Sequence, residues 1–287
     1  MLAIYKKELR SYFNSMIGYV FMAFFLLIVG IFFAVQNLAN FYPDFEYTLS
    51  SITFIIALLV PLLTMRLMAE ENKQKTDQLL FTAPVTATAI VVGKLLAVLT
   101  IFTLPMLITC FYPLILTQFG TVTLATAYAG ILAFTLLGAA YLSIGLFISS
   151  LTDSQVVAAV VSFCIFLFTI LMGGIANAIP SDHKTAVGVF TIIIFIICFI
   201  LYRMMRNLTV AVVAGLVAEA GLVGAFLLKP TLLDGAVGKV FGWISVTSRF
   251  SNFDLGIFDV SAVVYYISVI VLFVFLTVQV IKKKRWS

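Results

Sequence analysis

The sequence consists mostly of apolar runs of about 20 residues, which short polar segments separate. A run of this length crosses a hydrocarbon core of roughly 30 Å as an α-helix. Backbone groups inside lipid must be hydrogen-bonded within their own segment, so an all-α integral membrane protein is predicted. The expected transmembrane helices are residues 17–36, 52–68, 90–111, 126–148, 156–175, 187–202, 210–228 and 262–281. We therefore expect residues 1–287 to form one domain, a helical bundle with about eight transmembrane helices.

The N-terminal residues have a different, amphipathic pattern. Apolar side chains recur there at helical spacing, and basic and polar side chains occupy the other side. The apolar set is Leu2, Tyr5, Leu9, Tyr12, Phe13 and Met16, and the polar set is Lys6, Lys7, Arg10 and Asn14. We expect residues 2–15 to form an amphipathic helix that lies flat at the membrane interface.

The composition excludes a soluble globular domain. Apolar residues make up 63% of the chain and charged residues only 10%, which leaves too little polar surface for a water-soluble fold. The net charge of +5 comes from residues that flank the apolar runs. Since these residues form no basic stripe, we expect membrane lipids and no nucleic acid as partners.

The positions of Lys and Arg predict the orientation in the membrane. If both termini are cytoplasmic, only Lys184, Lys229, Lys239 and Arg249 of the 17 Lys and Arg residues lie outside. This bias predicts a multi-pass protein of the cell membrane (plasma or inner), with both termini cytoplasmic and an even number of crossings. Residues 229–259 then form an extracellular segment, in which residues 232–244 have the pattern of an interfacial or re-entrant helix.

No combination of side chains in the sequence predicts catalysis. Gly93-Lys94 is similar to the end of a phosphate-binding loop, but Thr88 stands where that loop needs its first Gly, and Leu95 follows the Lys. We interpret Gly93-Lys94 as the cytoplasmic start of the third transmembrane helix. Because His183 is the only histidine and no metal-binding motif occurs, we expect no enzyme activity, no cofactor and no metal.

The most polar segment, residues 66–85, lies between the second and third apolar runs. It holds six of the 29 Lys, Arg, Asp and Glu residues: Arg66, Glu70, Glu71, Lys73, Lys75 and Asp77. Residues 70–80 are good helix formers, Pro84 stops a helix, and Thr86 or Thr88 can cap the next one. Leu79, Leu80 and Phe81 are costly to expose to water. The segment is therefore either a solvated loop or a helix that docks on a partner.

Several short motifs accompany this segment. They are Met65-Arg66, Ala69-Glu70-Glu71, Thr76, Leu79-Leu80, Thr82, Pro84-Val85, Gly93-Lys94, residues 5–9, Tyr12-Phe13 and residues 250–284. Together they resemble type-2 ABC export permeases, most closely the gliding-motility and nitrous-oxide-reductase-maturation branch. The chain departs from that family at Lys75, where Gly is usual, and at Gln78, where Glu is usual. The family usually has six spans, so residues 187–228 look like an extra helix pair.

The resemblance implies a permease subunit of an ATP-binding-cassette exporter. Its partners would be cytoplasmic ABC ATPase subunits and either a second permease copy or a homologous permease. An accessory membrane protein is a further partner that the resemblance allows. Residues 66–85 would hold a coupling helix that rests in a groove of the ATPase. The implied contact residues are Glu70, Glu71, Lys73, Asp77, Gln78, Leu79 and Leu80. A second, shorter contact would come from Thr152, Asp153 and Ser154, a segment whose residues equally suit helix capping alone.

One acidic residue, Glu219, lies near the middle of an apolar run, among the small residues Gly215 and Gly221. Ionisable groups at that depth often mark a transport path, so Glu219 is a candidate intramembrane polar site. The alternative function is accordingly an ion- or proton-coupled secondary transporter that uses Glu219. A protonated Glu219 with a purely structural hydrogen bond, and a membrane scaffold that transports nothing, are the other interpretations.

Overall fold

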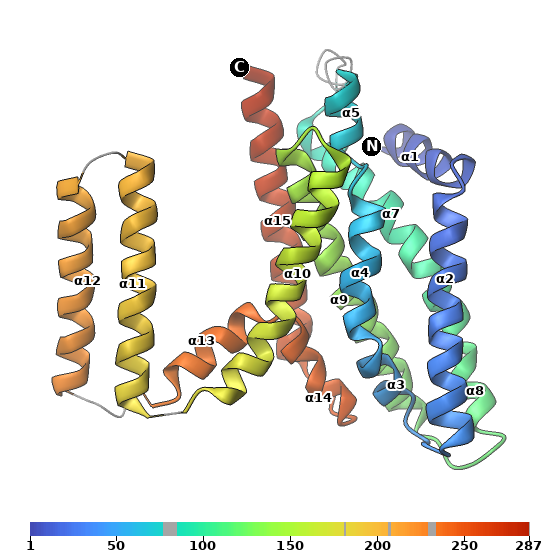
Figure 1. The fold of residues 1–287 in the computed structure, drawn as a ribbon. Helices are drawn as coiled ribbons and strands as arrows, with labels where there is room; N and C mark the ends of the chain where they lie inside the picture. Colours follow the sequence, from blue (N-terminus) through green and yellow to red (C-terminus); the bar gives the residue numbers. More distant parts are fainter. Residues whose placement is uncertain (77–84, 181, 206–207, 229–233, 287) are drawn as a thin grey trace. The chain divides into compact units, whose positions relative to one another are not determined.

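The computed structural model describes residues 1–76, 85–180, 182–205, 208–228 and 234–286, and these residues are helical with no strand among them (Figure 1). The chain divides into two units, residues 1–168 with 249–287, and residues 169–248. The helices are α1 (Leu2–Asn14), α2 (Ile17–Phe32), the π-helix η1 (Phe33–Ala39), α3 (Phe45–Ser51), α4 (Thr53–Thr64), α5 (Ala69–Gln74), α7 (Ala87–Thr109), α8 (Phe111–Leu116), α9 (Leu124–Leu151), α10 (Gln155–Ala178), α11 (His183–Met205), α12 (Leu208–Leu228), α13 (Ala236–Ile244), the 3₁₀-helix η3 (Thr247–Phe250), α14 (Ser251–Asp254) and α15 (Val260–Trp286).

The membrane fold predicted from the apolar runs is confirmed. Within the described residues, six helical segments are long and apolar enough to cross a membrane. They are Ile17–Ala39, Thr53–Gln74, Ala87–Leu116, Leu124–Leu151, Gln155–Ala178 and Val260–Arg285. The other two predicted crossings fall on α11 and α12, whose described apolar stretches are shorter, Thr185–Phe199 and Val212–Gly224. A count of eight crossings therefore still depends on α11 and α12.

Helix α9 lies at the centre of the first unit. It packs against α4, α7 and α15 along its length, and its residues from Leu137 to Leu146 are almost all buried. Gly145 lets α4 approach closely, because a Cβ at this position would lie 2.3 Å from Thr64 Oγ1. Such small residues at helix contacts are typical of membrane bundles, where close packing replaces the hydrophobic driving force.

Helices α1 and α5 and the C-terminal part of α15 lie at the same end of the first unit, and α3 and α14 lie at the other end (Figure 1). The predicted N-terminal helix is present as α1, but two of its residues, Glu8 and Tyr12, are buried against other helices. The amphipathic pattern therefore predicts the helix correctly, but a part of its surface faces protein.

In the second unit, α11 and α12 pack side by side. Ala186 of α11 and Val237 of α13 form a small buried cluster, against which Phe190, Phe226 and Phe241 pack. The helix predicted within residues 232–244 occurs as α13. Leu232 and Leu233, which belong to that prediction, lie outside the described residues.

Candidate functional site

The polar segment after α4 forms the short helix α5, and a turn at residues 65–68 connects the two helices. The helix ends at Gln74 because Lys75 has a φ of 55°, in the left-handed region that terminates helices and favours glycine. It is thus shorter than the run of helix formers at residues 70–80 indicates. The predicted contact residues Asp77, Gln78, Leu79 and Leu80 lie outside the described residues. The predicted cap of the next helix is confirmed, since the Thr86 hydroxyl accepts the N–H of Ala89.

Arg66 joins the end of α4 to α1. Its guanidinium donates hydrogen bonds to the hydroxyls of Ser11 (2.6 Å) and Ser15 (2.8 Å) and lies 4.7 Å from the centre of the Tyr12 ring. The Tyr12 hydroxyl donates in turn to the carbonyl of Leu63 at 2.6 Å. Burial raises the pKa of Tyr12, so this hydroxyl stays a donor at neutral pH. Helix α1 is therefore attached to α4 by several polar contacts.

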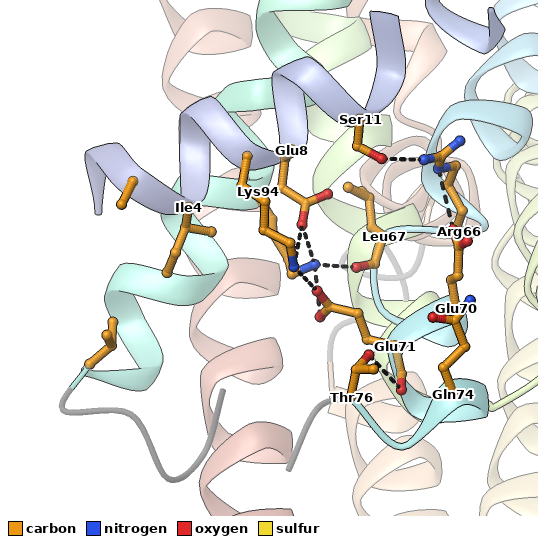
Figure 2. Close-up of a pocket in the computed structure, with 13 residues that line it drawn as sticks. Ile4, Glu8, Ser11, Arg66, Leu67, Glu70, Glu71, Gln74, Thr76 and Lys94 are labelled. Atoms are coloured by element: carbon orange, nitrogen blue, oxygen red, sulfur yellow. Dashed lines mark hydrogen bonds and ion pairs between the residues drawn. The ribbon is translucent and has the colours of Figure 1, made fainter. Parts of the chain in front are cut away.

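Lys94 lies at the centre of a buried cluster of charges (Figure 2). Its side chain is 1% exposed, and its Nζ lies 2.9 Å from Glu8 Oε1, 2.9 Å from Glu71 Oε2 and 2.6 Å from the carbonyl oxygen of Leu67. Three acceptors satisfy the three N–H bonds of the ammonium group. Lys94 thus connects α7 to α1, to α5 and to the turn that precedes α5.

Lys7 completes this group, which we call the Lys94 cluster: Lys7, Glu8, Glu71 and Lys94. Lys7 Nζ lies 3.0 Å from Glu71 Oε1. Partial burial acts to lower the pKa of Lys7, but the hydrogen bond and charge of Glu71, with the charge of Glu8, raise it overall. Two lysines and two glutamates make the cluster neutral, which is the condition under which buried charge is tolerated. The cluster lines a cavity of ≈ 620 Å³ between α1 and α5 (Figure 2).

The sequence pattern does not predict this cluster. It indicates Lys94 at the start of a transmembrane helix, whereas α7 begins at Ala87 and Lys94 lies about two turns inside it. Glu8 is not among the predicted site residues. One signal was present, because Ile4, Glu8 and Tyr12 recur at a spacing of four and so share one face of α1.

The predicted contact residues of α5 differ in exposure. Lys73 is exposed and the Glu70 side chain is 36% exposed, with its carboxylate 3.5 Å from Arg66 Nε. The Glu71 side chain is only 14% exposed, and both of its oxygens have lysine partners. Glu70 and Lys73 are therefore available to a partner, whereas Glu71 is bound within the chain.

The second predicted contact segment lies beside α5. The Ser149 hydroxyl accepts the N–H groups of Met68 and Ala69, each at 3.1 Å, and the Asn72 side chain donates to the carbonyl of Thr152 at 3.3 Å. Asp153 and Ser154 are exposed. The Ser154 hydroxyl also accepts the N–H of Val157 at 3.5 Å, a long contact in the position of a helix cap. The structure thus brings the two predicted contact segments together.

Glu219 occupies a separate position on α12. The Thr191 hydroxyl of α11 donates to Glu219 Oε1 at 2.8 Å. The same glutamate lines a cavity of ≈ 470 Å³ between these two helices, whose other lining residues include Phe195, Phe199 and Leu216. Among the residues that the structure describes, no three His, Cys, Asp or Glu side chains are placed to hold a metal ion.

Comparison with known families gives one match. A family model described as ABC-2 family transporter protein matches residues 35–275, which include α5, α7 and the connection between α9 and α10. A search of the curated proteins finds no match.

Proposed function

The chain belongs to the ABC-2 family of transporter proteins, and on this premise we propose that it is the permease subunit of an exporter driven by a separate cytoplasmic ATPase. The observation that carries the proposal is the pairing of two exposed segments at one end of the bundle. Asn72 of α5 is hydrogen-bonded to Thr152 in the connection between α9 and α10. A surface made of two adjacent segments suits a protein partner better than an isolated loop does.

In this proposal the end of the bundle that carries α1 and α5 faces the cytoplasm, as does the C-terminal end of α15. The basic residues of the last turn of α15, Lys283, Lys284 and Arg285, agree with this orientation through the positive-inside bias. The permease then lies in the cell membrane with both termini inside. The narrower relationship to the gliding-motility and nitrous-oxide-reductase-maturation branch rests on the short motifs around α5.

The ATPase would contact the exposed side of α5 through Glu70 and Lys73, and the residues that follow through Asp77, Gln78, Leu79 and Leu80. Thr152, Asp153 and Ser154 would form the second contact. Glu71 would not be part of this contact, because both of its carboxylate oxygens are bound to lysines of the same chain. Binding of ATP would close two ATPase subunits, move the attached helices and expose a central path to each side in turn. The path would be formed with a second permease copy or a homologous permease.

Charge reversal tests the docking surface. We expect the double variant Glu70→Lys/Lys73→Glu to lose most co-purification of the ATPase from membranes, because it inverts the charges of the half-buried Glu70 and the exposed Lys73 and changes no residue of the Lys94 cluster. The matched control is Lys6→Glu, which changes an exposed lysine of α1. Equal ATPase capture by wild type, control and double variant would contradict the docking assignment.

The orientation has its own test. In a variant whose three native cysteines are replaced, a membrane-impermeant thiol reagent should not label Lys73→Cys in intact cells and should label it after the cells are opened. Labelling in intact cells would place α5 outside and would remove the basis for a cytoplasmic ATPase partner.

Glu219 favours a second candidate, ion- or proton-coupled transport. Glu219 lines an apolar cavity between α11 and α12, and acidic side chains that line cavities inside a membrane are common elements of proton paths. Proteoliposomes that contain a pH-sensitive dye distinguish the candidates. Proton uptake without ATP that is lost in Glu219→Gln would support the second candidate, and the absence of such uptake in the wild type would contradict it.

A further inference from the structure

Helix α5 is too short to transmit movement by itself. It has six residues, and isolated helices shorter than about 12 residues are marginal in water. Its described covalent connection runs through the turn at residues 65–68 to α4. A force applied to α5 would reach α4 through this turn and α9 through Ser149 and Thr152, and in the described part of the chain it would reach α1 through side-chain contacts.

The Lys94 cluster supplies those contacts. Lys94 belongs to α7, and its ammonium group binds the Glu71 side chain of α5 and the Leu67 carbonyl of the preceding turn. The same ammonium group binds Glu8 of α1. Movement of α1 or α5 away from α7 would take a carboxylate from the buried Lys94 ammonium group, and removing a partner from a buried charge is costly.

Gly93 makes this geometry accessible. A Cβ at Gly93 would lie 3.3 Å from Ile4 Cβ and 3.3 Å from the Met1 carbonyl oxygen. The absence of a side chain at position 93 therefore allows α1 to lie directly on α7, so that Glu8 reaches the next residue, Lys94. Tyr5 and Thr100 extend the same contact, with their hydroxyls 3.1 Å apart.

We propose that Lys94 is a positioning residue for energy coupling, which makes α5, α1 and the first turns of α7 move as one body when the ATPase moves α5. This inference rests on the proposed function. It assigns α1 a role in transmission, beyond that of a helix at the membrane surface. The inference also separates docking, which uses Glu70 and Lys73, from transmission, which uses Glu71 and the buried Lys94.

Distances between pairs of spin labels test the proposal in the complex of full-length permease and ATPase. The labels are placed on exposed positions after replacement of the three cysteines. The pair Arg10→Cys and Lys73→Cys reports α1 against α5, and the pair Lys73→Cys and Lys282→Cys reports α5 against α15. In the wild type, trapping with ATP and vanadate should change the second distance and leave the first unchanged.

The test variant is Lys94→Met, which removes the charge and keeps the length of the side chain. We expect the ATPase to co-purify and hydrolyse ATP as in the wild type, while the distance between α1 and α5 broadens and becomes nucleotide-dependent. The nucleotide-driven population shift measured between α5 and α15 should fall by about tenfold, as for the loss of an allosteric coupling. Lys94→Arg should retain both properties, and Lys6→Met is the matched charge control.

The outcomes separate the two proposals. If Lys94→Met keeps the wild-type distance between α1 and α5 in both nucleotide states, the role of Lys94 in transmission is wrong. If the wild type itself shows no nucleotide-driven change between α5 and α15, the proposed function fails, and the nucleotide-free distance between α1 and α5 still tests the cluster. Should Lys94→Met fail to fold, Glu8→Gln removes one partner and is measured in the same way.

Discussion

The hydroxyl of Ser149 accepts the backbone N–H of Ala69 at 3.1 Å, which fixes the first turn of α5 to the end of α9. The same oxygen accepts the N–H of Met68 and donates to the carbonyl of Met65, each at 3.1 Å. One buried hydroxyl thus satisfies two N–H groups that no residue of α5 could reach, since the first N–H groups of a helix lack partners within it.

Ser149→Ala should therefore destabilise the protein by about 1–3 kcal/mol, because it leaves two buried N–H groups without an acceptor. Thermal unfolding in detergent or nanodiscs measures the loss. The matched control is Ser150→Ala, since the Ser150 hydroxyl donates to the Phe147 carbonyl in its own helix. Equal unfolding temperatures for the two variants would contradict the role of Ser149.

The backbone at Lys75 leads to a stabilising substitution. With a φ of 55°, Lys75 occupies the conformation that glycine adopts without a steric penalty. Lys75→Gly should raise the free energy of unfolding by roughly 0.5–1 kcal/mol, whereas Lys73→Gly, within α5, should lower it by a similar amount. The opposite signs make the pair its own control in a thermal unfolding experiment.

The contact between α4 and α9 should not tolerate a larger residue at Gly145. An added Cβ would lie 2.3 Å from Thr64 Oγ1 and 2.8 Å from Thr64 Cβ, so the two helices would have to separate. We expect Gly145→Ala to destabilise the protein by about 1–3 kcal/mol. At Gly221 of α12 a Cβ meets no described atom within 4 Å, so Gly221→Ala should be neutral or slightly stabilising. Similar unfolding temperatures for both variants would contradict this packing.

The sequence alone predicts most of the bundle but little of the coupling site. Apolar runs of membrane length identify the helices, since lipid leaves the backbone few alternatives. The cap at Thr86 is local chemistry and is also predictable. The pairing of Glu8 with Lys94 joins residues 86 apart in the sequence and exists only because α1 folds back on α7. The spacing of Glu8 with Ile4 and Tyr12 places these residues on one face of α1, but a face that meets a buried lysine has the same polar pattern as a face in water. Amphipathicity therefore does not identify the partner of Glu8.

The short length of α5 has a similar explanation. Residues 70–80 have good helix propensity, but propensity is a weak signal that a single left-handed residue overrides. The residue type does not predict the left-handed backbone conformation of Lys75, because lysine rarely adopts it. At the end of α5 the N–H of Lys75 donates to the carbonyl of Asn72 and the N–H of Thr76 to that of Glu71, a closing turn that residue propensity does not predict.

The last prediction concerns pH and the buried Glu46 of α3, at the other end of the first unit. This residue is 3% exposed, and burial raises the pKa of its carboxyl, as do the charges of Asp44 and Asp254. When the pKa of a carboxyl is higher in the folded protein than in the unfolded chain, the fold is most stable at a pH where the carboxyl is protonated in both states. Its contribution is lost as the pH rises from the unfolded pKa through the higher folded pKa. Glu46→Gln should therefore raise the unfolding temperature at neutral pH and flatten the decline of the unfolding temperature with rising pH.

Asp259→Asn is the control of opposite sign. The hydrogen bond from Asn252 lowers the pKa of Asp259, so the stability that the Asp259 carboxylate contributes is lost as the pH falls. Unchanged pH profiles for Glu46→Gln would mean that this carboxyl titrates as it does in the unfolded chain.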